Sequence, residues 1–114
     1  MASEGEEVQP KASITVSRNP LDDSKNATYS FMGEDHTLGN LLKNQVVKNK
    51  HVEFVAYSVP HPSEAICNLR VQVAGFSDSD TDTVVRHALK RITKSCDILE
   101  EKFLESLATF KAQS

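Results

Sequence analysis

A long stretch near the C-terminus, from about Thr83 to Ala112, contains neither glycine nor proline. Its apolar residues recur at steps of three and four, with one step of seven: Val85, Leu89, Ile92, Cys96, Leu99, Phe103 and Phe110. A repeat of this period predicts a single long helix with one apolar stripe. Roughly 30 residues at 1.5 Å each give a helix of about 45 Å, which a small domain cannot cover along its whole length. An uncovered apolar stripe must meet another chain or aggregate, so the sequence predicts a protein–protein interaction module.

A second, shorter helix is predicted between Gly33 and Lys50. Its apolar residues have helical spacing, at Leu38, Leu41, Leu42 and Val46. Thr37 directly precedes this stripe, and we place the N-cap there because its hydroxyl can accept a hydrogen bond from a free backbone N–H. Gly39 in the first turn costs about 1 kcal/mol relative to alanine. It is either a tolerated surface glycine or a site where another helix or a strand comes close to the backbone, and we interpret it as permitting close helix approach across, or beside, a subunit interface.

Four segments alternate apolar and polar residues as β-strands do. They are Ser13–Arg18, Thr28–Met32, Val52–Val59 and Ile66–Ala74. Asn19-Pro20 predicts a hairpin loop between the first two. The resulting expectation is an α+β fold, a small antiparallel sheet of about four strands with two helices packed on one face. Residues 13–114 would form this domain, and the acidic residues 1–12 a disordered tail.

Composition limits the classes of function. The chain has 114 residues, enough for one domain, and its formal net charge of −3 argues against free-standing binding to nucleic acid. Its two cysteines, Cys67 and Cys96, lack the short spacing of a metal site. No apolar run is long enough to span a membrane, and the acidic N-terminus is unlike a secretory signal. We therefore expect an intracellular, soluble protein.

No motif for catalysis or for cofactor binding is found in the sequence. The chain lacks a phosphate-binding loop and a nucleophile elbow, and its four histidines lie at least ten residues apart. A small enzyme that uses His36 or His61 with an acidic neighbour is the alternative. A basic cluster between Arg86 and Lys94 is either a solvated helix face or a contact for an acidic partner surface.

Four stretches of the chain, taken in order, resemble a known family. They are GEDHTLGNLLKNQVVKN, VEFVAYSVPHPSE, NLRVQ and CDILEEKF. Together they resemble the small α-like subunits of eukaryotic nuclear RNA polymerases, which are similar to the dimerisation domain of the bacterial α subunit. The resemblance covers about Ile14 to Phe103. It favours the form shared by RNA polymerases I and III, and the corresponding subunit of RNA polymerase II is the alternative.

The resemblance implies a non-catalytic role without cofactor, metal or catalytic residues. Residues 13–114 would be an α-like dimerisation domain that forms a heterodimer with a larger α-like subunit. That heterodimer would be the platform on which the second-largest and largest, catalytic subunits assemble to transcribe ribosomal, transfer and other small RNAs. The resemblance also implies a nuclear protein, in nucleolus and nucleoplasm, with no membrane contact and no direct sequence-specific contact to nucleic acid. A stand-alone homodimeric module is the remaining alternative.

We place the partner surface on one side of both predicted helices. The residues expected to contact the larger α-like subunit are Leu38, Gly39, Leu41, Leu42, Gln45, Leu89, Ile92, Cys96, Leu99 and Phe103. The sequence leaves open which of them belong to the chain's own core.

Overall fold

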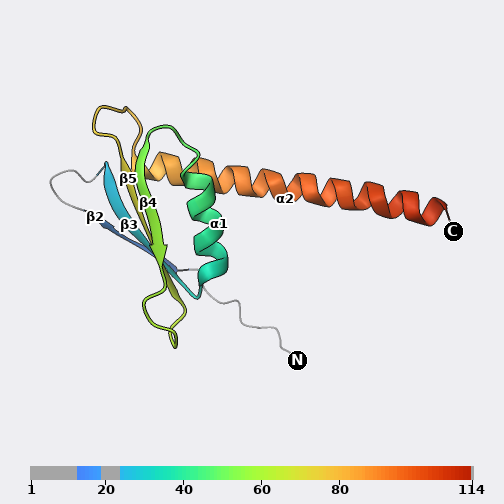
Figure 1. The fold of residues 1–114 in the computed structure, drawn as a ribbon, viewed down its shortest axis with the longest axis horizontal. Coiled ribbons are helices and arrows are strands. Elements are labelled where there is room, and N and C mark those ends of the chain that lie inside the picture. Colours follow the sequence, from blue (N-terminus) through green and yellow to red (C-terminus); the bar gives the residue numbers. More distant parts are fainter. Residues whose placement is uncertain (1–12, 19–23, 114) are drawn as a thin grey trace, which may run out of the picture.

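The computed structural model describes residues 13–18 and 24–113. Within these ranges the elements are, in order, β2 (Ser13–Arg18), β3 (Asn26–Met32), α1 (His36–Val46), β4 (Val52–Ser58), β5 (Ile66–Val73) and α2 (Thr81–Ala112). Both helices lie on one face of a four-stranded sheet, and α2 extends far beyond it (Figure 1). The predicted α+β class is confirmed, and each strand boundary lies within about two residues of its expected place. The predicted tail at 1–12 and the Asn19-Pro20 loop lie outside the described residues.

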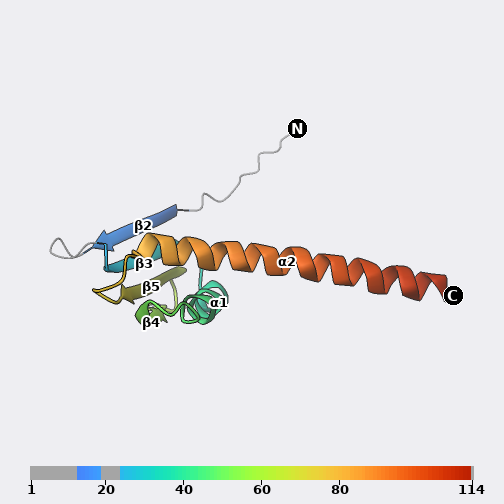
Figure 2. The same cartoon turned by 90° about the horizontal axis from the view of Figure 1, so that it is seen from above.

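The strands pair in the order β2-β3-β5-β4, and every pairing is antiparallel. β2 and β3 form the expected hairpin, with Ser13 opposite Met32 and Arg18 opposite Ala27. β5 lies between β3 and β4, so it is an inner strand of the sheet. Viewed from above, the sheet runs from β2 to β4 with the helices along one side (Figure 2).

The core lies between the sheet and the two helices. Side chains alternate between the two faces of a strand, so the apolar set of β5 points toward the helices. Three elements supply the apolar side chains with no exposed surface: Leu42 and Val46 from α1, Cys67, Leu69 and Val71 from β5, and Val84 and Ala88 from α2. Full burial of one large aliphatic side chain stabilises a fold by roughly 1.5–3 kcal/mol. This layer therefore holds both helices on the sheet.

The other side of the sheet carries no helix in the described part of the chain (Figure 2). We call it the open face. The strand register places on it Ser13, Thr15, Ser17, Asn26, Thr28, Ser30, Met32, Phe54, Ala56, Ser58, Ile66, Asn68, Arg70 and Gln72. All of them are at least partly exposed. The alternation along β5 predicted this arrangement of one packed and one uncovered face.

Helix α1 begins earlier than predicted. Its N-cap is Asp35, whose carboxylate accepts a hydrogen bond from the backbone N–H of Thr37 at 3.1 Å. The prediction of Thr37 as the cap is therefore wrong by two positions. Both residue types can cap a helix, but His36 and Thr37 already belong to the first turn, where free N–H groups need an acceptor.

Gly39 permits close packing of α1 against the sheet of the same chain. A Cβ atom on this residue would lie 2.4 Å from Cδ2 of Tyr57 and 2.8 Å from Sγ of Cys67. These neighbours belong to β4 and β5. The interpretation of Gly39 as a site of helix approach at a subunit interface is therefore wrong. The glycine is required because two strand side chains occupy the space that a Cβ would need.

We expect Gly39→Leu to lower the free energy of unfolding by about 3 kcal/mol, because the clash involves the Cβ itself and overpacking of a core typically costs about 1–3 kcal/mol. Gly75→Leu is the matched control, since a Cβ at Gly75 meets nothing within 4 Å. Urea unfolding followed by circular dichroism measures both changes. Equal unfolding midpoints for the two variants would contradict this account of Gly39.

Candidate interface for a partner chain

Helix α2 packs on the sheet only near its N-terminus. Its buried residues are Thr81, Val84, Val85 and Ala88. Ile92 is half-buried, and beyond it every described side chain of the helix is exposed except that of Leu107, which is half-buried. We call the part from Thr93 to Ala112 the distal half of α2. At 1.5 Å per residue it extends about 30 Å past the last contact with the sheet. Figures 1 and 2 show this part of α2 protruding from the rest of the fold.

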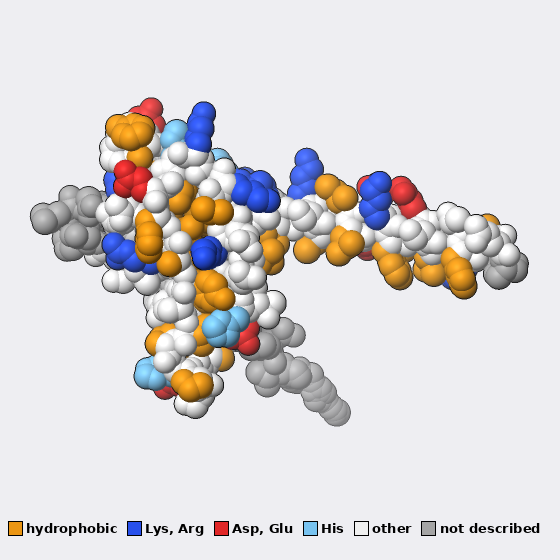
Figure 3. All heavy atoms as spheres, viewed as in Figure 1, with side chains coloured by type: hydrophobic (Ala, Val, Ile, Leu, Met, Phe, Trp, Pro, Cys, Tyr) orange, Lys and Arg blue, Asp and Glu red, His pale blue; other side chains and the backbone are white. Residues whose placement is uncertain are grey.

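The distal half carries large apolar side chains in solvent. Leu99 is 70% exposed, Phe103 62% and Phe110 68%. Together with Cys96 they form one stripe along the helix, which we call the distal stripe. Figure 3 shows hydrophobic side chains gathered along the lower edge of the protruding helix. An exposed apolar stripe of this size is typical of a surface that another protein covers.

An apolar groove lies at the root of the protruding helix. It has a volume of about 190 Å³ and is lined by Ser13, Ile14, Phe31, Met32, Glu34, Leu38 and Leu89. Ile14 remains 54% exposed and Val16 45% exposed, although both are on the helix side of β2. β2 is an edge strand, and the helices pack on β4 and β5 instead. Leu89 lies in the same heptad row as the distal stripe, so it connects stripe and groove.

A polar network anchors the first turn of α2 to the β2–β3 hairpin. Arg18 forms an ion pair with Asp82 and donates a hydrogen bond to Oγ1 of Thr81 at 3.1 Å. The hydroxyl of Tyr29 donates to the Asp82 carboxylate at 2.5 Å and lies 2.9 Å from Oγ1 of Thr81. Asp80 caps the helix by accepting a hydrogen bond from the Thr83 backbone N–H at 2.8 Å.

The protonation states in this network suit a structural role, and we call the network of Arg18, Tyr29, Thr81 and Asp82 the clamp. The hydrogen bond from Tyr29, followed by that from Arg18, lowers the pKa of Asp82 from its usual 3.8. Burial and the bond to Asp82 raise the pKa of Tyr29 to about 12. Asp82 is therefore charged and Tyr29 neutral over a wide range around neutral pH, so the clamp keeps its hydrogen bonds.

A second contact fixes the angle between the helices. Nη2 of Arg91 donates to the backbone oxygen of Gln45 at 2.6 Å, and Nε donates to its side-chain oxygen at 3.3 Å. Arg91 belongs to the basic cluster that was interpreted as either a solvated helix face or a contact for an acidic partner surface, and it is half-buried between α2 and the end of α1. Arg91 of α2 therefore donates a hydrogen bond to a backbone carbonyl in the C-terminal turn of α1.

The ten residues predicted to contact a partner are divided between core and surface. Gly39 and Leu42 are buried in the chain's own core, and Leu42 has no exposed surface. The structure corrects the prediction at these two positions, because both residues hold α1 on the sheet. Three are half-buried, namely Leu38, Gln45 and Ile92, and five are exposed, namely Leu41, Leu89, Cys96, Leu99 and Phe103. Only the exposed and half-buried residues remain candidates for a contact.

Two candidates on β2, Ile14 and Val16, were not among the predicted contact residues. Their alternation with Thr15 and Ser17 indicates a strand with one packed face. Which layer covers that face depends on where the helices lie, and the sequence carries no signal for this. They enter the candidate surface only because the described helices leave this edge strand uncovered.

The histidines do not converge on a site in the described residues. No group of three or more His, Cys, Asp or Glu side chains there could hold a metal ion. Nδ1 of His36 lies 3.2 Å from the Tyr57 hydroxyl, and Nδ1 of His51 lies 2.9 Å from Oγ of Ser77. His36 also lines a cavity of about 470 Å³ with Asp35, but the Asp35 carboxylate already caps α1.

Comparison with known proteins shows to which family this chain belongs. The model of the RNA polymerase Rpb3/Rpb11 dimerisation domain matches residues 26–102, which include β3, α1, β4, β5 and the first two-thirds of α2. The chain belongs to this family.

Relatives within the Rpb3/Rpb11 family are similar over most of the chain. The chain is 40% identical to the DNA-directed RNA polymerases I and III subunit RPAC2 of Saccharomyces cerevisiae over 86 residues, which are 75% of this chain and 59% of that protein. It is 33% identical to RPAC2 of Danio rerio over 108 residues, 94% of each chain. The chain thus spans less than two-thirds of the yeast relative and nearly all of the fish relative.

The fold is also similar to that of a crystal structure, the DNA-directed RNA polymerase subunit L of Thermoplasma acidophilum. The TM-score is 0.74 at 19% sequence identity, and the match covers 92% of this chain and 98% of that one. This likeness supports the fold alone. Among the described helices, none has the length and apolar character needed to cross a membrane.

We expect Asp82→Asn to reduce the free energy of unfolding at pH 7 by about 1 kcal/mol, since half of the Asp82 side chain is exposed and its ion pair is screened. The folded-state pKa of Asp82 is lowered, so its contribution is present above the unfolded value near 3.8. It is lost as the pH falls through the folded value. Urea unfolding at several pH values should therefore show the two proteins converging below about pH 4. A constant difference down to pH 2 would contradict the clamp.

Proposed function

We propose that this chain is the small, non-catalytic α-like subunit of RNA polymerases I and III. The observation that carries the proposal is the distal stripe, where Leu99, Phe103 and Phe110 are each more than half exposed. Such a helix is suited to being covered by a second chain. Family membership supports dimerisation as its use. The names of the two relatives support RNA polymerases I and III as the complex.

The proposed partner is a larger α-like subunit of the same polymerase. The distal stripe, Leu41, Leu89 and the groove beside β2 would contact helices of that subunit, with Leu38, Gln45 and Ile92 at the margin. The chain would contribute no catalytic group. Its role would be to complete the heterodimer on which the second-largest and largest subunits assemble, in the nucleolus and nucleoplasm.

Two alternatives make different predictions about the complex. The small α-like subunit of RNA polymerase II would use the same fold, but the two reported relatives are named as subunits of polymerases I and III. A stand-alone homodimer would cover the stripe with a second copy of the chain. In that case the chain would be stable and soluble when expressed alone, whereas the proposed function expects aggregation or poor expression without the larger subunit.

Leu99→Asp should abolish co-purification with the larger α-like subunit, because a carboxylate would be desolvated at the centre of an apolar contact. The measurement is co-expression of both chains followed by affinity purification. Ala108→Asp is the matched control. It introduces the same group on the same exposed helix, nine residues further on and so about half a turn around the axis.

Two results would contradict the proposal. One is undiminished recovery of the larger subunit with Leu99→Asp. The other is purification of the wild-type chain from nuclear extract with the largest subunit of RNA polymerase II and none from polymerases I and III. Light scattering of the wild-type chain alone tests the homodimer alternative, because a homodimer would give a stable particle of twice the chain mass.

A further inference from the structure

The open face of the sheet is unusually poor in charge. Charged residues make up 25% of the chain, yet Arg70 is the single charged residue among the paired positions that the register places on the open face of the described strands. Glu53, at the irregularity of β4, is a second charged residue beside this face. The other paired positions carry hydroxyl, amide or apolar side chains. Solvated surfaces are rich in lysine and glutamate, whereas the centres of protein interfaces are depleted of them. The composition of this face is therefore that of a covered surface.

Arg70 occupies the middle of this face. It lies on the inner strand β5, directly opposite Thr28 on β3 and Ala56 on β4. Both neighbours are short, so they leave the guanidinium accessible, and Arg70 is exposed. No hydrogen bond or ion pair joins its guanidinium to another described residue. The Glu53 carboxylate accepts its hydrogen bond from Gln72, at 3.0 Å.

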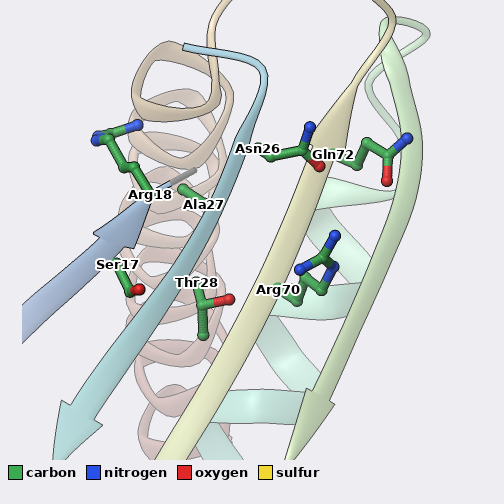
Figure 4. Close-up of a pocket in the computed structure, with 7 residues that line it drawn as sticks. All are labelled: Ser17, Arg18, Asn26, Ala27, Thr28, Arg70 and Gln72. Carbon is green, nitrogen blue, oxygen red and sulfur yellow. The ribbon is translucent and has the colours of Figure 1, made fainter. Parts of the chain in front are cut away.

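Two shallow depressions meet at Arg70. One, of about 350 Å³, is lined by Arg70 with Ser17, Thr28 and Gln72 among others, and also by Arg18, which forms an ion pair with Asp82. Figure 4 shows these side chains on adjacent strands around the depression. The other, of about 360 Å³, has Arg70 and the half-exposed ring of Phe54 on its wall. The Arg70 guanidinium thus lies beside hydroxyl and amide groups on one side and beside an apolar ring on the other.

We propose that the open face is a second protein-binding surface, on which Arg70 binds a carboxylate of an Asp or Glu side chain from a partner protein. A guanidinium binds a carboxylate through two parallel hydrogen bonds, and the surrounding hydroxyl and amide groups can satisfy the remaining polar atoms of such a partner. The partner's contact surface is otherwise neutral, to match the open face. This surface lies on the opposite side of the sheet from α1 and α2, so it can be occupied while the distal stripe is bound. The proposal therefore goes beyond heterodimerisation.

Other occupants fit less well. A second copy of this chain, related by two-fold symmetry about the centre of the face, would bring one Arg70 toward the other. A nucleic-acid backbone is bound by several basic residues that follow its phosphates, and the described open face offers one. An acidic residue of a different protein is the occupant that matches the charge.

The experiment has two steps and uses the chain in complex with its polymerase partners. First, p-benzoyl-phenylalanine replaces Phe54, beside Arg70, and is photo-cross-linked in cells. The expected product is a cross-link to one protein, at a segment that contains Asp or Glu. Second, Arg70→Glu and Arg70→Gln are compared with the wild type for binding of the purified heterodimer to that protein.

We expect Arg70→Glu to weaken this binding by about 30-fold or more, because the reversal leaves two carboxylates facing each other. Recovery of the larger α-like subunit should stay at the wild-type level. Lys50→Glu, at an exposed turn after α1, makes the same change of charge and should leave the binding unchanged. Replacing the partner's carboxylate by lysine should restore binding to Arg70→Glu.

Three outcomes would overturn the proposal. They are a cross-link to nucleic acid alone, no cross-link above background, and wild-type affinity for Arg70→Glu with an unchanged melting temperature. None of them bears on heterodimer formation. Failure of the proposed function is recognised separately, because the wild-type chain would then not recover the larger α-like subunit at all.

Discussion

The length of α2 relative to the sheet determines most of what this protein can do. Strands of six to eight residues span about 20–27 Å, whereas a helix of 32 residues spans about 48 Å. The sheet can bury only the first three turns, where Val84 and Ala88 have no exposed surface. The helix nevertheless continues with the same apolar repeat. Exposure of Leu99 and Phe103 follows from this mismatch, and it is resolved only by another chain.

The anchoring of α2 gives the exposed part a defined direction. The clamp of Arg18, Tyr29 and Asp82 holds its first turn on the β2–β3 hairpin, and Arg91 ties its third turn to the end of α1. Two fixed points along a helix determine its axis, so the distal stripe is presented in one orientation before a partner arrives. Such preorganisation reduces the entropy that is lost on association.

The two faces of the sheet have different chemistry, and this separates two kinds of contact. The helix side continues from the core into an apolar surface, which is typical of a permanent interface between subunits. The open face is polar and carries few charged residues around Arg70, which is typical of a contact that gains specificity from hydrogen bonds and from a charge pair. A subunit built in this way can join one partner through its helices while its sheet faces a second.

Much of the fold was predictable because it depends on local periodicity. Alternation in Ser13–Arg18 and Ile66–Val73 identified strands and their two faces, and the heptad repeat identified α2 and its uncovered stripe. The caps were less certain, since Asp35 and Thr37 are both good acceptors. Asp35 directly precedes the first turn and caps it, whereas Thr37 lies within that turn.

Periodicity also determines which side chains share one side of a helix, but it says nothing about what lies against that side. Leu42 and Leu99 belong to equally regular stripes, yet Leu42 is buried on the sheet and Leu99 is 70% exposed. The sequence alone therefore determined the elements, their apolar sides and the need for a partner. The tertiary structure decided that Gly39 faces Tyr57 and Cys67, and that Ile14 remains uncovered. These outcomes depend on contacts between segments far apart in the chain, and the spacing of residues within one segment carries no record of them.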